Sequence, residues 1–106
     1  MRKITYADAI NEALHEEFRR DDKTVHLATD MNEPLLEEFG EDRVRSTPIS
    51  ESAFVGAAIG LAGSGFRPVV DIRMATFGFV AMDQLMNQAA KITYMFGSNY
   101  KRTFLW

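Results

Sequence analysis

TPISESAFVGAAIGLAGSGFRPVV, residues 47–70, is the stretch that decides the fold of this 106-residue chain. Pro48 fixes its own φ angle and disfavours helix at the residue before it, so a helix has to begin after Pro48. Ser50 is a suitable N-cap, which puts Glu51 in the first turn of that helix. Small residues follow until a Gly-Ser-Gly triplet, and residues 69–72 are an apolar run. The stretch therefore predicts a helix followed by a strand.

Gly56 and Gly60 lie about one turn apart inside this predicted helix. Glycine in a helix interior costs about 1 kcal/mol relative to alanine, so two of them need a reason. One reason is a close crossing with another helix or with a sheet, in which Glu51 only complements the helix dipole. The other is a ligand site, in which the Glu51 carboxyl group holds a flat, nitrogen-rich molecule. The spacing by itself favours the packing interpretation.

Helices alternate with short apolar strands along the chain, which is typical of an α/β fold with a largely parallel sheet. We expect a first helix capped by Thr5, with Asp8 in a variant of the capping box. Strands are expected around residues 25–27 and Val44, with a short helix over 33–39 between them. Helical spacing predicts that the first helix buries Tyr6, Ile10, Ala13, Leu14 and Phe18. One last long helix is expected to share a face among Met82, Leu85, Met86, Ala89 and Ile92.

Composition excludes several classes of function. A hydrophobic share of 46% can form a core, and a net charge of −3 argues against nucleic acid or an anionic membrane as partner. The chain has no cysteine, which excludes a disulfide framework and a thiolate metal site. No apolar run has the length of a membrane span, and no signal-peptide core follows the first residues. We therefore expect a single domain, or part of one, in the cytoplasm.

The blocks around Glu51 resemble a known family. Glu51, Gly56 and Gly60, with an apolar residue after each glycine, resemble the signature of the pyrimidine-binding domain of thiamine diphosphate enzymes. The flanking blocks that narrow the resemblance are Thr47-Pro48-Ile49-Ser50-Glu51, Arg67-Pro68-Val69-Val70, Met82-Asp83-Gln84 and Asn87-Gln88-Ala89-Ala90-Lys91. In this order they resemble the β subunit of the E1 component of 2-oxoacid dehydrogenases. That family includes the pyruvate, branched-chain and acetoin dehydrogenases.

The resemblance runs from Lys3 to about Gly97, with one apparent deletion after Asp30. It implies an incomplete three-layer α/β/α fold with a mainly parallel sheet. It also implies that residues 1–106 are the amino-terminal part of a transketolase-like pyrimidine-binding domain, and that the carboxy-terminal domain of the family is absent. The segment 98–106 has no counterpart in this resemblance, so the chain is expected to be a truncated β subunit.

The resemblance also implies a cofactor, thiamine diphosphate, and residues that bind it. Glu51 would act as catalytic residue by hydrogen-bonding the N1′ nitrogen of the aminopyrimidine and moving the proton that activates the cofactor. Phe77 would pack on the face of the ring, although a core phenylalanine is the alternative at that position. Gly56 would belong to the same cofactor-binding helix. The Mg²⁺ and diphosphate ligands of this family lie on the α subunit, so no metal site is expected in this chain.

For the whole enzyme, the resemblance implies oxidative decarboxylation of a 2-oxo acid and acyl transfer to the lipoyl group of E2. The partner would be an E1 α subunit in an α2β2 assembly. Two alternatives stay open: a non-catalytic remnant or interaction module that docks on an E1 α subunit, and a transketolase-like synthase. The Asn-Gln-Ala-Ala-Lys block at residues 87–91, which resembles the subunit-contact helix of the E1 family, argues against the synthase. None of these residues predicts which 2-oxo acid is the substrate.

Other polar residues carry weaker predictions. Asp30 either couples active sites, as the resemblance implies, or is an ordinary turn residue at a strand end. His15 is expected on the solvated side of the first helix, and His26 could face either side of its strand. Two isolated histidines do not make a metal site. Arg43 and Arg45 are expected to be solvated or to form an interface edge.

Overall fold

The computed structural model describes residues 2–97 and contains a sheet of three parallel strands in the order β2-β1-β3. The strands are β1 (Thr24–Ala28), β2 (Val44–Ser46) and β3 (Arg67–Asp71). His26 in the central strand pairs with Val44 on one side and Val69 on the other. Strands were predicted at all three places, and β3 begins two residues earlier than expected. Residues 98–106 lie outside the described residues, so the structure does not test the prediction that the family resemblance stops at about Gly97.

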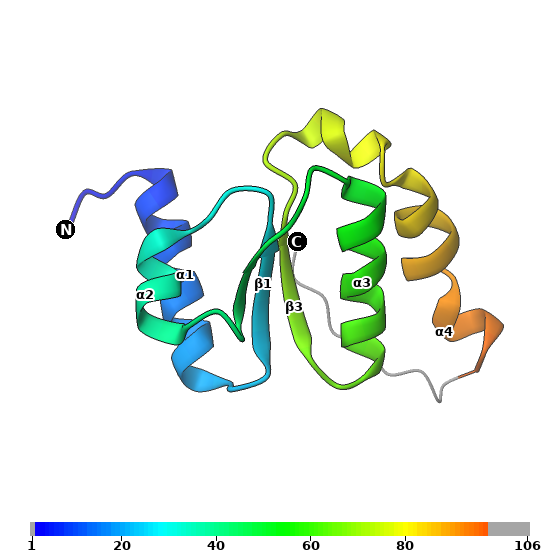
Figure 1. The fold of residues 1–106 in the computed structure, drawn as a ribbon, viewed down its shortest axis with the longest axis horizontal. Coiled ribbons are helices and arrows are strands. Elements are labelled where there is room, and N and C mark those ends of the chain that lie inside the picture. The colour runs from blue at the N-terminus through cyan, green and yellow to red at the C-terminus, as the bar shows by residue number, and fades with distance from the viewer. Residues whose placement is uncertain (1, 98–106) are drawn as a thin grey trace.

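Helices cover both faces of this sheet (Figure 1). One face carries α1 (Tyr6–Arg20) and α2 (Glu33–Phe39), and the other carries α3 (Glu51–Gly63). The larger core cluster lies between α3 and the sheet and consists of Leu27, Phe54, Val55, Ala58, Val70 and Ala81. The smaller one, under α1 and α2, consists of Phe18, Leu35 and Val44. The three-layer α/β/α arrangement with a parallel sheet confirms the predicted fold class.

Local signals set the ends of the first two helices as predicted. The Thr5 hydroxyl accepts a hydrogen bond from the Asp8 backbone N–H at 3.1 Å, and the Asp8 carboxylate bonds back to Thr5. This capping box lowers the pKa of Asp8, chiefly through the hydrogen bonds from Thr5. The α2 helix begins after Asn32, which caps it, and ends at Gly40 with a φ of 78°. That left-handed conformation suits glycine because it has no Cβ.

The predicted buried stripe of α1 is wrong over its first half. Phe18 is buried and Leu14 half-buried, but Tyr6 is 85% exposed, Ile10 47% exposed, and Ala13 also exposed. Ile10, Ala13 and Leu14 instead line an open groove of ≈ 1210 Å³ between α1 and β3. The apolar contacts of α1 with α2 and the sheet come from its second half, where Leu14 and Phe18 lie. Within residues 2–97 no element packs against the remaining apolar positions of α1.

The single long helix predicted near residue 82 is also wrong. Two short segments take its place, a π-helix η2 (Gln84–Ala89) and α4 (Ile92–Met95), and a 3₁₀ helix η1 (Ala75–Phe79) precedes them. Wider turns are visible in the backbone, where the Ala90 N–H donates to the Leu85 carbonyl at 3.0 Å. Each π turn adds a residue, so a 3.6-residue period loses register across it. Ala89 is therefore buried, whereas Met82 and Met86 are exposed.

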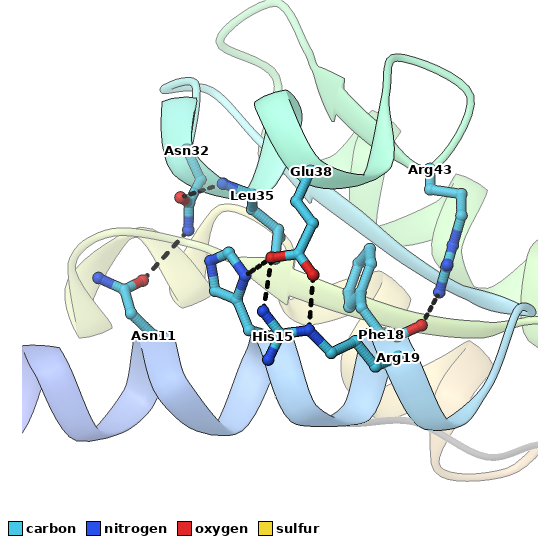
Figure 2. Close-up of polar contacts among 8 residues, drawn as sticks. All are labelled: Asn11, His15, Phe18, Arg19, Asn32, Leu35, Glu38 and Arg43. Atoms are coloured by element: carbon cyan, nitrogen blue, oxygen red, sulfur yellow. Dashed lines mark hydrogen bonds and ion pairs between the residues drawn. The ribbon is translucent and has the colours of Figure 1, made fainter.

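Polar contacts that the sequence did not predict join α1 to α2 (Figure 2). Glu38 accepts two hydrogen bonds from Arg19, at 2.6 and 2.7 Å, and its second oxygen lies 2.7 Å from His15 Nδ1. These hydrogen bonds, first the one from Arg19, lower the pKa of Glu38. His15 is thus a half-buried contact residue, and the expectation of a solvated histidine is wrong.

Arg43 is not the solvated or interface residue that was expected. Its guanidinium donates to the backbone carbonyls of Phe18 at 2.8 Å, Asp21 at 2.6 Å and Thr24 at 3.0 Å. It also lies 4.6 Å from the centroid of the Phe18 ring. A planar guanidinium can satisfy several carbonyl groups at the end of α1 at once. Arg45, in contrast, is exposed as predicted.

Candidate functional site

The carboxyl edge of the sheet brings the candidate residues together. Ligands of open α/β sheets bind outside the carboxyl ends of the strands. The chain leaves β2 at this edge and enters α3, and the chain leaving β3 passes over the same edge (Figure 1). The Ser52 hydroxyl donates to the Val80 carbonyl at 2.7 Å, which ties the first turn of α3 to the end of η1. Glu51 and η1 are therefore parts of one edge.

Glu51 is the first residue of α3 and is only 8% exposed. No residue of the described part of the chain donates a hydrogen bond to its carboxyl group. A polar group that packing largely withdraws from water is stabilised when it finds a hydrogen-bond partner. The N-terminal end of the α3 dipole favours a negative charge there but supplies no hydrogen bond. The carboxyl group is thus available to a ligand.

Two more polar groups near the head of α3 lack partners. Ser50 occupies the N-cap position, but its side chain makes no capping hydrogen bond. The Thr47 hydroxyl oxygen is buried and has no hydrogen-bond partner in residues 2–97. Thr47 was not predicted as a site residue, because the sequence around it indicates only that Pro48 keeps it out of the helix. The sequence has no local signal for the burial of this hydroxyl.

Gly56 has the packing reason that the spacing indicated. A Cβ built on Gly56 would lie 3.1 Å from the Oε1 atom of Gln84 and 3.2 Å from its Cδ atom. Gln84 begins η2, so the glycine lets η2 approach α3 closely. At Gly60 a Cβ would meet nothing within 4 Å among the residues described. A direct contact of Gly56 with a cofactor stays a prediction.

Phe77 lies in η1 and is 38% exposed, so it is not the core phenylalanine of the alternative interpretation. Phe79, its neighbour, is 73% exposed. The turn that carries both rings is attached to the first turn of α3 through the Ser52–Val80 hydrogen bond. Phe77 is therefore partly exposed in a segment that is attached to the head of α3.

Asp30 ends the loop after β1 and forms an ion pair with Arg73, which follows β3. Arg73 has a positive φ of 70°, uncommon for a residue with a side chain. The Met74 N–H donates to the Ile72 carbonyl at 2.8 Å, which closes a γ-turn around Arg73. The Asp71 carboxylate accepts from the Arg73 N–H at 2.7 Å. Asp30 lies in a bend after β1, which agrees with the interpretation as a turn residue, and its ion pair with Arg73 was not predicted. A coupling role stays a prediction.

His26 points away from this site. It is 4% exposed and lies on the α1 face of the sheet, because it pairs with Val44 of the smaller core cluster. Burial lowers the pKa of His26, and the charge of Asp71 opposes this only in part. Residues 2–97 contain no group of three or more His, Cys, Asp or Glu side chains placed to hold a metal ion. Within the same range, no helix is long and apolar enough to cross a membrane.

Comparison with known proteins gives consistent matches. Residues 2–106 match the family described as transketolase, pyrimidine binding domain, so the similarity continues past Gly97, where we expected it to stop. The chain is 39% identical over 108 residues to the pyruvate dehydrogenase E1 component subunit beta of Rickettsia bellii, covering 93% of this chain and 33% of that protein. It is 40% identical over 103 residues to the 2-oxoisovalerate dehydrogenase subunit beta of Bacillus subtilis, covering 89% and 32%.

A third relative is the acetoin:2,6-dichlorophenolindophenol oxidoreductase subunit beta of Cupriavidus necator. It is 39% identical over 115 residues, covering 91% of this chain and 34% of that protein. The chain thus spans about a third of the length of these relatives.

Proposed function

This chain belongs to the transketolase pyrimidine-binding domain family, and we propose that it supplies the part of a thiamine diphosphate site that binds the aminopyrimidine ring. The observation that carries the proposal is Glu51, a residue only 8% exposed at the head of α3, whose carboxyl group has no partner in residues 2–97. The N1′ nitrogen of the ring would give this group the hydrogen bond that it lacks. The chemistry of the residues present therefore fits this half of the cofactor.

Each site residue has a distinct role in this proposal. Glu51 holds a proton at N1′ and moves it as the cofactor is activated. Phe77 packs its ring on the face of the pyrimidine, where a stacked aromatic pair is worth about 0.5–1.5 kcal/mol beyond area burial. Gly56 allows η2 to lie close to α3 and so helps to fix the edge that carries both side chains.

The bound cofactor would supply the nucleophilic carbon and the electron sink needed to decarboxylate a 2-oxo acid. In the whole enzyme, we propose oxidative decarboxylation followed by acyl transfer to a lipoyl group on E2. These steps are proposed for an assembly and not for this chain by itself. An E1 α subunit, in an α2β2 arrangement, would supply the Mg²⁺ and diphosphate ligands. We also propose a cytoplasmic location. The comparisons do not decide it, because some relatives are named as mitochondrial.

The test is Glu51→Gln in a complex reconstituted with an E1 α subunit, with Glu37→Gln as the matched control. Glu37 is exposed on α2, on the other face of the sheet. We expect Glu51→Gln to lower the decarboxylation rate by about 10²–10⁴-fold, the usual contribution of a positioned proton-transfer group. The control should keep the full rate. A Glu51→Gln complex that activates the cofactor normally would show that the assignment is wrong.

A second candidate is an interaction module that docks on an E1 α subunit without catalysis, and the observation that favours it is the open apolar groove between α1 and β3, where Ile10 is 47% exposed. In that case the chain would bind the α subunit, but thiamine diphosphate would not tighten the complex. Calorimetric titration of the α subunit with this chain, with and without the cofactor, distinguishes the two functions. Tight cofactor binding by the chain alone would contradict a shared site.

A further inference from the structure

The Thr47 hydroxyl is the one side-chain polar atom in the described part of the chain that is both buried and without a hydrogen-bond partner. Its backbone N–H donates to the Ala28 carbonyl at 2.8 Å, so Thr47 extends the β1–β2 ladder by one residue past Ser46. Nearly all buried polar groups in native proteins are satisfied, and an exception calls for an explanation.

Strand alternation fixes the face on which the Thr47 side chain lies. Leu27 belongs to the core cluster under α3 and pairs with Arg45, so both residues point to the α3 face. Side chains alternate along a strand, and Thr47 is two residues beyond Arg45. Its hydroxyl therefore lies on the α3 face, at the carboxyl edge and four residues before Glu51, which is 8% exposed. A buried hydroxyl without a partner and an unpartnered carboxyl group thus belong to the same helix head.

We propose that the Thr47 hydroxyl is a second hydrogen-bonding contact for the ligand that Glu51 binds, a flat heteroaromatic ring with amino and ring-nitrogen groups. This inference rests on the proposed function and adds a residue to its site. A hydroxyl can both donate and accept, so it suits either kind of polar atom on such a ring. The unsatisfied hydroxyl destabilises the ligand-free chain, and the ligand removes that cost when it binds.

The first measurement is the thermal stability of the chain and of Thr47→Val, which keeps the shape but removes the hydroxyl. Removing a buried group that has no partner should raise the melting temperature of the free chain by about 4–8 °C, the shift that corresponds to about 1 kcal/mol in a small domain. If the hydroxyl had a structural role, its removal would lower the melting temperature. A lower melting temperature for Thr47→Val would therefore overturn the inference.

The second measurement is binding of the free pyrimidine half of thiamine, a hydroxymethyl-aminopyrimidine, followed by NMR titration of the chain. Thr47→Val should weaken binding by about 5- to 10-fold, the value of one net hydrogen bond. Thr47→Ser, which keeps the hydroxyl, should bind within about 2-fold of the unchanged chain. If Thr47→Val does not fold, Thr47→Ala against Thr47→Ser isolates the hydroxyl, since both lack the same methyl group.

Glu51→Gln separates this inference from the proposal on which it rests. Weaker binding by Glu51→Gln together with unchanged binding by Thr47→Val would leave the proposed function standing and reject the role of Thr47. Unchanged binding by both variants would reject both. If the unchanged chain shows no saturable binding, the inference about Thr47 fails, and the reconstituted complex still decides the role of Glu51.

Discussion

Gly56 and Gly60 are both glycines of α3, but their surroundings differ. The missing Cβ matters at Gly56, where Gln84 approaches, and not at Gly60, where the space is open. We predict that Gly60→Ala raises the free energy of unfolding by about 0.5–1 kcal/mol, because alanine restricts the unfolded chain and favours helix. Gly56→Ala should give no net gain, because Gln84 has to move. Urea unfolding of both variants checks this, and equal gains would contradict close packing at Gly56.

Among the elements, the junction of α1, β1 and α2 depends on one side chain. Arg43 bonds three carbonyl groups and lies against the rings of Phe18 and Phe39. We predict that Arg43→Lys lowers the free energy of unfolding by about 1–3 kcal/mol, because an ammonium group cannot reproduce the planar fork of donors. Arg45→Lys is the matched control, since Arg45 is exposed and 4.0 Å from Asp42. Similar unfolding midpoints for the two variants would show that the Arg43 contacts contribute little.

At the scale of the whole molecule, an open groove leaves apolar side chains uncovered. Ile10 is 47% exposed on one wall, and Met74 is 54% exposed on the other. In addition, β3 is an edge strand in the described sheet, and such edges favour association. We predict that the isolated chain self-associates as its concentration rises, and that Ile10→Ser reduces this in sedimentation velocity. Ala7→Ser, at an exposed position outside the groove, should not reduce it. A chain that stays monomeric at every concentration would instead favour the independent interaction module.

The sequence by itself determined the features that depend on neighbouring residues along the chain. The Thr5–Asp8 capping box, the α2 helix ending at Gly40 and the start of α3 at Glu51 follow from caps, glycine and proline, which act within one turn. The order of strands and helices then predicted the parallel α/β sheet. Family resemblance pointed to Glu51 as a site residue, and the structure adds that this residue is buried and that its carboxyl group has no partner in residues 2–97.

Only the tertiary structure decided which of these residues are covered, and by what. Helical spacing predicted burial of Ile10, but no element of the described chain packs on that part of α1. Arg43 has its three carbonyl partners only because segments distant in sequence meet there, and the burial of the Thr47 hydroxyl likewise has no signal in its neighbouring residues. The π-helix at Gln84–Ala89 likewise forms where the segment packs against α3. Periodicity reports which face of an element is apolar, whereas burial and hydrogen bonding depend on the partner that the fold brings to that face.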